Sequence, residues 1–318
     1  MSGANEKLYR DLKRLDEELS ELAKGFDRTY RDYLITLGRA VRHQLVLATY
    51  HLCTHGYPEA FLQLSFTGRQ ELQQHLRNIA QQAELLFLQC LYVSTLRSIE
   101  QLQSEESEED SPDEGETDND RNEVDREEAE DNPSEDFDEE SPDFETPEET
   151  GLFVIDLANP ETLPTLVQHH ALTPQLLDRW QESIEDGIVE VLGQLSNQTN
   201  QLLQRFGILP KKFPPALLEA ASQAEAPSEA VSGPPNVLTL LVETGGSSES
   251  EPNLMKLMTV HLRLSEIEFA DSQLKGWRDR LRQLSAKLLS LKGEYQRKQR
   301  ERAIVEAESA WRSSWFED

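Results

Sequence analysis

The chain has 318 residues, of which 60 are acidic and 31 basic, for a formal net charge of −29. A surplus of this size repels nucleic acid and anionic lipid, so we do not expect the protein as a whole to seek phosphate. The charge is concentrated in residues 104–150, where 25 Asp and Glu stand against two Arg. We therefore predict three parts: residues 1–103, a disordered acidic linker at 104–150, and residues 151–318.

Nothing in the chain indicates export or insertion into a membrane. The first 15 residues alternate charge with leucine, unlike the apolar core of a signal peptide. The most apolar stretch, Leu85–Leu96, is 12 residues long, whereas a membrane span needs about 20. Cys53 and Cys90 are expected on antiparallel helices roughly 30 Å apart, too far for a disulfide. We expect a cytoplasmic protein with no transmembrane segment.

Apolar side chains in residues 1–103 recur with the spacing of a coiled coil. From Leu8 to Phe26 they alternate at intervals of four and three, with charged residues between them. The stripe continues at helical spacing to the Gly-Tyr-Pro sequence at 56–58, which is typical of a helix end. The pattern predicts one long amphipathic helix.

A second run with this spacing extends from Leu72 to Val93 and is widened by further apolar residues. A helix that is apolar over so much of its circumference must be covered on more than one side, by this chain or by another copy. We predict a coiled-coil-like helical hairpin that forms a homo-oligomer, most simply a dimer. The leucines assigned to its interaction surface are Leu15, Leu22 and Leu86.

Residues 104–150 contain four apolar side chains, and four prolines interrupt any helix. Nothing in this segment can offset the entropy lost on ordering, so disorder is predicted. We expect a protease to cut here before it cuts either flank, leaving two folded fragments.

Residues 151–318 mix strand and helix patterns and are predicted to be an α+β unit. The strongest helix signal begins at Thr173, with a proline after it, and ends near Gly207. Two β-rich runs, Val237–Glu243 and Leu257–Leu264, predict a small antiparallel hairpin. A two-stranded hairpin is marginal alone, so a third strand or a helix face should join it. The candidate third strand is Leu152–Leu157, and short helices are expected near 159–169 and 216–224.

The last predicted element is a long basic helix over residues 271–316. A heptad stripe runs from Leu274 to Tyr295, and between Lys275 and Arg302 ten Lys and Arg stand against three acidic residues. The favoured interpretation is the solvated flank of a coiled coil, and the alternative is contact with a polyanion. The basic residues assigned to such contact are Lys275, Arg278, Arg282, Lys292, Arg297 and Arg300.

Trp311 and Trp315, with Phe316 beside them, lie at the end of this helix. Trp is over-represented in binding hot spots, so these rings offer an exposed docking tip. Packing back onto the domain is the favoured expectation.

No pattern in the chain indicates catalysis or a bound cofactor. His51 and His55 have the helical spacing of a zinc-binding pair, but Cys53 points elsewhere and no third ligand can be named. Acid–base catalysis needs carboxylates held in a shaped pocket, which a disordered segment does not supply. We expect no metal, no cofactor and no enzymatic activity.

These patterns together favour a non-enzymatic cytoplasmic interaction protein, a scaffold or adaptor that self-associates through its heptad helices. The alternative is a nucleic-acid-associated or regulatory factor whose basic C-terminal helix is modulated by the acidic linker, with nucleic acid the less favoured partner. An enzyme with a site assembled from dispersed residues has no positive support in the sequence.

Overall fold

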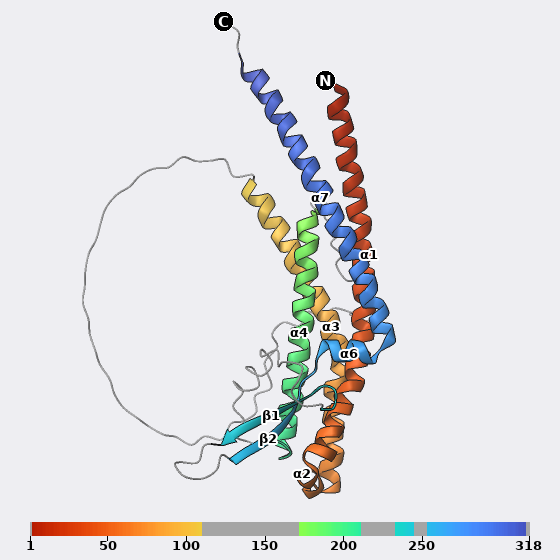
Figure 1. Ribbon diagram of the computed structural model, residues 1–318, viewed down its shortest axis with the longest axis vertical. Coiled ribbons are helices and arrows are strands. Elements are labelled where there is room, and N and C mark those ends of the chain that lie inside the picture. Colours follow the sequence, from red (N-terminus) through yellow and green to blue (C-terminus); the bar gives the residue numbers. More distant parts are fainter. Residues whose placement is uncertain (1, 110–171, 211–232, 245–252, 316–318) are drawn as a thin grey trace, which may run out of the picture.

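The computed structural model describes residues 2–109, 172–210, 233–244 and 253–315 (Figure 1). Four long helices dominate these residues and confirm the predicted, mainly α fold. They are α1 (Ser2–His51), α3 (Phe66–Glu109), α4 (Pro174–Arg205) and α7 (Ser272–Ser314).

Several sequence predictions concern residues outside the described ranges. They are the strand at 152–157, the short helices near 159–169 and 216–224, and the acidic segment from residue 110 onward.

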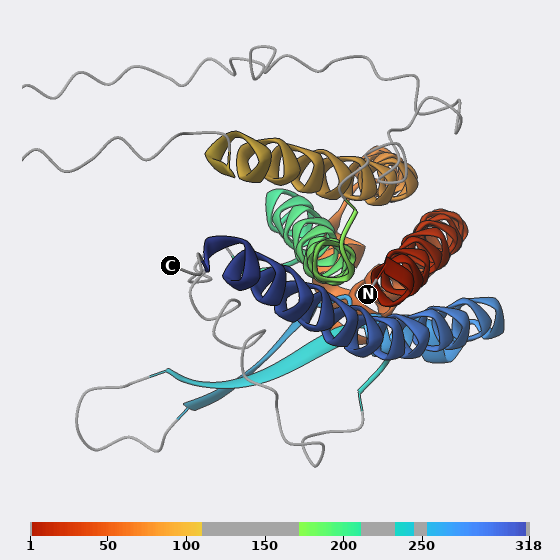
Figure 2. The same ribbon diagram turned by 90° about the horizontal axis from the view of Figure 1, so that it is seen from above.

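The four long helices form a bundle in which each helix is antiparallel to its two neighbours (Figure 2). The α1–α3 pair is the predicted hairpin. Along the α4–α7 contact, Asp178 meets Lys292 and Glu185 meets Arg278, so the two helices run in opposite directions. Helices α7 and α1 are also neighbours and also antiparallel. Lys298, in the second half of α7, pairs with Asp11, near the start of α1, at 3.1 Å. This is an up-and-down arrangement, in which α4 follows α3 and α7 follows α4 around the axis.

Local sequence accounts for where these helices begin and end. The first helix ends in one π-helical turn, η1 (Leu52–Gly56), and short α2 (Pro58–Gln63) follows it. At the start of α4 the Thr173 hydroxyl accepts the Leu176 amide at 3.2 Å, as its position before a proline predicts. Gly207, at φ 72°, ends α4 in the left-handed conformation that favours glycine.

The predicted antiparallel hairpin is present, but its second strand ends earlier than expected. Strands β1 (Val237–Thr244) and β2 (Asn253–Val260) pair with Val237 opposite Val260. After β2 the chain turns into a short helix, α6 (Leu264–Ala270), instead of continuing as a strand. Asn236, at φ 59°, enforces this turn because its side-chain oxygen accepts the Arg263 amide at 3.0 Å.

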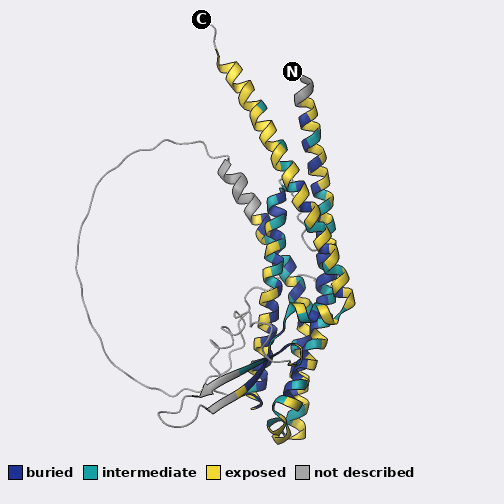
Figure 3. Cartoon of the chain, in the orientation of Figure 1, coloured by how far each residue is buried: buried dark blue, intermediate teal, exposed yellow. Residues whose placement is uncertain are grey.

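The two predicted folded regions share one hydrophobic core (Figure 3). The heptad stripe of α1 is buried against α7, where Leu15 and Leu19 are each 1% exposed. The stripe of α3 is covered by α1 on one side and by α4 on the other. The cover that α1 and α3 require therefore comes from the same chain, and the boundary drawn at the acidic segment separates two stretches of a single core.

Two glycines allow the helices to approach closely. A Cβ added at Gly38 of α1 would lie 2.6 Å from the Glu84 Cα of α3, and one added at Gly187 of α4 would overlap the Cys90 Sγ of α3. An added side chain at Gly38 would meet the backbone of α3, so α3 would have to move, whereas at Gly187 the clash is with the Cys90 side chain.

We expect Gly187→Ala to lower the free energy of unfolding by about 1–3 kcal/mol, because the added methyl overpacks the α3–α4 contact. The Cβ of Cys90 lies 3.6 Å from that methyl, an ordinary contact, so Cys90→Ala should relieve the clash. In the Cys90→Ala background, Gly187→Ala should then be neutral or stabilising by up to about 1 kcal/mol through its helix propensity.

Denaturant unfolding of the four proteins in this cycle measures the coupling. The control is Gly193→Ala on the same helix, where nothing lies within 4 Å of an added Cβ. Equal effects of Gly187→Ala in the two backgrounds would contradict the packing described for this contact.

Candidate interaction surface

One face of α7 points away from the bundle and carries both basic and large apolar side chains. At 3.6 residues per turn these positions fall within about 80° of one another, on the side opposite the buried leucines. We call them the outer face of α7. Its basic and large apolar members are Lys275, Arg282, Leu289, Arg297, Arg300, Ile304, Trp311 and Trp315.

The apolar members of the outer face are strongly exposed (Figure 3). Trp311 and Trp315 are 67% and 65% exposed, with their ring centroids 5.8 Å apart, and Leu289 is 72% exposed. The favoured expectation, that the tryptophans pack back on the domain, is wrong. The last turns of α7 extend past the start of α4 and diverge from the first turns of α1 (Figure 1).

The basic members of the outer face are available to a ligand. Lys275, Arg297 and Arg300 are exposed and form no ion pair with any described side chain. Among the described side chains, Arg282 pairs with Asp279, one turn away, at 3.2 Å in an exposed position. An exposed pair of this kind contributes at most about 1 kcal/mol and is easily exchanged for another anion.

The remaining residues predicted for interaction are buried, half-buried or paired with other side chains of this chain. Leu15 is in the core, and Leu22 and Leu86 are half-buried against it. Lys292 pairs with Asp178 across the α4–α7 contact, and Arg278 is only 15% exposed. Lys292 and Arg278 therefore contribute to the contacts that hold α7 on the bundle, and Leu15 and Leu22 lie on the buried stripe of α1 that packs on α7.

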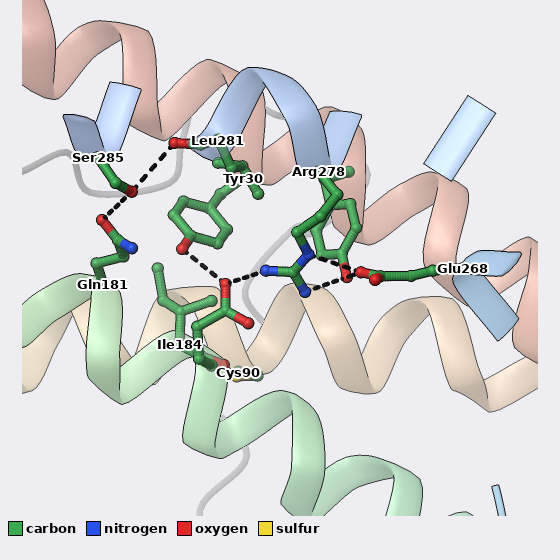
Figure 4. Close-up of polar contacts among 10 residues, drawn as sticks. Tyr30, Cys90, Gln181, Ile184, Glu268, Arg278, Leu281 and Ser285 are labelled. Atoms are coloured by element: carbon green, nitrogen blue, oxygen red, sulfur yellow. Dashed lines mark hydrogen bonds and ion pairs between the residues drawn. The ribbon is translucent and has the colours of Figure 1, made fainter. Parts of the chain in front are cut away.

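Arg278 is the centre of a buried polar cluster contributed by four helices (Figure 4). Its guanidinium donates to Glu185 of α4, to Glu268 of α6 and to the Tyr33 hydroxyl of α1, each at 2.7 Å. Tyr30 of α1 donates to the same Glu185 oxygen at 2.8 Å, and Tyr33 donates to Glu268 at 2.6 Å. The guanidinium also lies 4.8 Å from the centroid of the Tyr33 ring, within reach of a cation–π contact.

The protonation states in this cluster favour structure over proton transfer. Burial raises the pKa of both Tyr30 and Tyr33 well above the usual range, so the phenols stay protonated. Burial by itself lowers the pKa of Arg278, but its bonds to Glu185 and Glu268 outweigh that effect and raise it. The cluster holds a fixed cation between two carboxylates. A general acid or base needs a pKa near neutral pH, whereas the pKa values of these tyrosines and this arginine are raised away from it.

Sequence reasoning assigned no role to Tyr30, Tyr33, Glu185 or Glu268. The two tyrosines are core positions of α1, Glu185 follows the core residue Ile184 on α4, and Glu268 falls between the predicted second strand and the predicted C-terminal helix. The one sequence feature that indicated the outer face of α7 is the spacing of Ile304 and Trp311. They are seven residues apart and so lie on the same side of a helix.

A groove of about 600 Å³ between α3 and α4 is lined by Cys90, Ser94 and Gly187. Burial raises the pKa of the Cys90 thiol to about 11, and its sulfur lies 3.8 Å from the Ile184 carbonyl oxygen (Figure 4). A thiol with this pKa is a poor nucleophile at neutral pH.

His51, the last residue of α1, and His55 of η1 lie close together without a third possible metal ligand in the described part of the chain. The rings of His51 and His55 lie 5.5 Å apart, and burial raises the pKa of the neighbouring Cys53 thiol to about 11. Among the residues the structure describes, no three His, Cys, Asp or Glu side chains are grouped to hold a metal.

Comparisons with protein families, with curated proteins and with solved structures each returned no match. Within the described helices, none is long and apolar enough to cross a membrane.

Proposed function

We propose that this chain is a non-enzymatic interaction protein, an adaptor that binds an acidic, aromatic-containing segment of a partner on the outer face of α7. The observation that carries the proposal is the exposure of Trp311 and Trp315 at the end of a helix that the bundle holds rigidly at its other end. Paired, exposed tryptophans beside arginines are typical of binding hot spots. A cytoplasmic location belongs to the same proposal, because both cysteines are free thiols.

The chemistry of the face selects the class of partner. Arg297 and Arg300 favour carboxylates, and Ile304, Trp311 and Trp315 favour apolar or aromatic side chains. Asp279 also lies on this face, so the acidic part of a partner should contact the half beyond Leu289. We place self-association through the heptad seams outside the proposal, since those seams are filled within one chain.

A second candidate function is regulation by the chain's own acidic segment. Residues 131–147 contain eight acidic residues, no basic ones, and Phe137 and Phe144 seven positions apart. This composition matches the partner chemistry that we infer for the outer face. A tethered competitor is present at about millimolar effective concentration, so it would weaken binding of an external partner.

One titration tests both candidates, with a fluorescent peptide of residues 131–147 as the probe. The full chain is compared with a variant in which 104–150 is replaced by an uncharged Gly/Ser linker of equal length. We expect the variant to bind the peptide about tenfold more tightly, because the tethered competitor is gone. The difference should be largest at about 50 mM salt and shrink by about 300 mM, since contacts between exposed charges are screened.

Substitutions separate the outer face from the rest of the surface. Trp311→Ala with Trp315→Ala should weaken peptide binding by about tenfold or more. Phe269→Ala, which removes a 93% exposed ring from α6, should leave binding unchanged. A probe peptide in which Phe137 and Phe144 are both replaced by Ala tests how much the aromatic rings contribute to peptide affinity, and it should bind more weakly.

Three results count against these proposals. No binding of the peptide to the linker variant would remove the adaptor proposal in this form. Binding of a DNA or RNA oligonucleotide that equals peptide binding and ignores the tryptophan substitutions would favour a nucleic-acid-associated factor. Equal peptide affinity with and without the acidic segment would remove only the regulatory candidate.

A further inference from the structure

The side of α1 that packs on α7 continues beyond the point where α7 begins. Arg278 of α7 donates to Tyr33 of α1, and the two helices are antiparallel. Ser272, the first residue of α7, therefore lies level with about residue 39 of α1. At 3.6 residues per turn, four later positions of α1 fall within about 40° of Tyr33 around the helix. They are Ala40, Gln44, Leu47 and His51.

The short helix α6 lies beside this later stretch of α1 (Figure 1), and a groove of about 570 Å³ runs between them. We call it the α1–α6 groove. Leu47 of α1 and Phe269 of α6 line it and are 39% and 93% exposed, whereas Leu37, one turn before Ala40, is fully buried. Val46 and Tyr50, 42% and 55% exposed, extend the apolar surface along α1. Helix α6 is seven residues long and leaves these side chains in contact with solvent.

Positive charge lies at one end of the groove. His43 and Arg39 stand one and two turns before Leu47 on the exposed side of α1. His43 forms no ion pair with a described side chain. Arg39 lies 3.9 Å from Glu84, and because exposed ion pairs are weak, another anion can replace Glu84 there. Residues 33–57 contain two Arg and three His, with no Asp or Glu.

The negative charge beside the groove is already engaged. Among the described side chains that line it, the acidic one is Glu266 of α6. Its carboxylate accepts from the Arg263 guanidinium at 2.7 Å and from the Asn236 amide. The charge that the described residues leave for a partner is therefore positive.

We propose that the α1–α6 groove binds an amphipathic helix of a partner protein, with its apolar face on Leu47 and Phe269 and its carboxylates toward Arg39. A helix fits because the positions of α1 beside the groove recur at intervals of three and four, into which the ridges of a second helix pack. Such a helix continues the path that α7 takes along α1. Charge complementarity selects a partner that is acidic beside its apolar face. The site shares no residue with the outer face of α7, so it does not depend on the adaptor proposal.

Methyl NMR of the full chain tests the proposal with two synthetic peptides. Each is a helix of about four turns with leucines along one face. One peptide has glutamates at both ends, and the other has lysines there. The glutamate peptide should shift the methyl signals of Leu47 and Val46 and leave those of Val189, 64% exposed on α4, unchanged. It should bind about tenfold more tightly than the lysine peptide, whereas attraction by the net charge of −29 would give the opposite order.

Substitutions locate the bound peptide. Leu47→Glu should weaken binding of the glutamate peptide by about tenfold or more, because it removes an apolar contact and adds a like charge. Val189→Glu, at an exposed aliphatic position of α4, is the matched control and should leave binding unchanged. Arg39→Glu combined with His43→Glu should reverse the preference, so that the lysine peptide binds more tightly.

Two further variants separate this site from folding and from the outer face of α7. Phe269→Ala should weaken the glutamate peptide by about fivefold and leave the denaturant midpoint of unfolding unchanged, because the ring is exposed. Trp311→Ala with Trp315→Ala should leave the affinity of the glutamate peptide unchanged. Loss of binding at the groove and loss of binding at the outer face are thereby distinguished.

The proposal is overturned if about 1 mM glutamate peptide leaves the Leu47 methyl signals in place, or if the two peptides bind equally. A lower midpoint of unfolding for Phe269→Ala would show that the chain itself fills the groove. Peptide binding that requires Trp311 would place the peptide on the outer face of α7. Leu47 signals that shift with protein concentration alone would show that a second copy occupies the groove. Each of these results excludes the proposed partner helix.

Discussion

Replacing Arg278 by alanine is expected to lower the free energy of unfolding by about 3 kcal/mol or more. The substitution leaves Glu185 and Glu268, whose side chains are 31% and 18% exposed, without their cation. Removing one partner from a buried ion pair is costly because the remaining charge is neither solvated nor compensated. Tyr33 also loses a hydrogen bond and its cation–π contact. Denaturant unfolding measures the change.

The matched control is Arg282→Ala, one turn further along α7. Arg282 is 72% exposed and pairs with Asp279, so its removal should change stability by no more than about 0.5 kcal/mol. Combining Arg278→Ala with Glu185→Gln and Glu268→Gln should recover part of the loss, because the uncompensated charges are then gone. A loss of similar size for Arg278→Ala and Arg282→Ala would mean that the cluster does not hold the four helices together.

Replacing Leu15 by glutamate should destabilise the protein by about 4 kcal/mol or more. Leu15 is 1% exposed where α1 packs on α7, and a core leucine contributes about 2–5 kcal/mol before the penalty for burying a carboxylate is added. The control is Tyr9→Glu on the same helix, a 59% exposed position where a charge remains in water.

The Leu15→Glu experiment also separates packing within one chain from packing between copies. If α7 of the same chain covers Leu15, the midpoint of unfolding should not depend on protein concentration. If the seam joins two chains, the midpoint should rise with concentration, and the variant should lose stability most at low concentration. The second result would contradict the assignment of this seam to one chain.

Sequence alone predicts the helices and their ends because both depend on local chemistry. The spacing from Leu8 to Phe26 and from Leu72 to Val93 marks the buried faces of α1 and α3, and Thr173 and Gly207 mark the two ends of α4. Each of these signals lies within a few residues of the feature it predicts.

What covers each face was decided by the tertiary structure. A heptad stripe has the same chemistry whether its partner is another helix of the chain or another copy, so Leu15 was assigned to a dimer although α7 covers it. The fate of Trp311 and Trp315 was misjudged for a related reason. Whether a ring packs back depends on whether neighbouring helices run beside the end of α7, which no local sequence pattern records.

The polar cluster and the end of β2 show the same limit. The second strand was expected to continue to Leu264, but it ends at Val260, where the Asn236 side chain accepts the Arg263 amide, and the helix that follows places Glu268 beside Arg278. Tyr33 and Arg278, which are 245 positions apart in the sequence, meet because α1 and α7 pack side by side. Periodicity indicates which side of a helix is buried. Which segment covers that side depends on how well distant segments match in shape and charge, and that match exists only once the chain has folded.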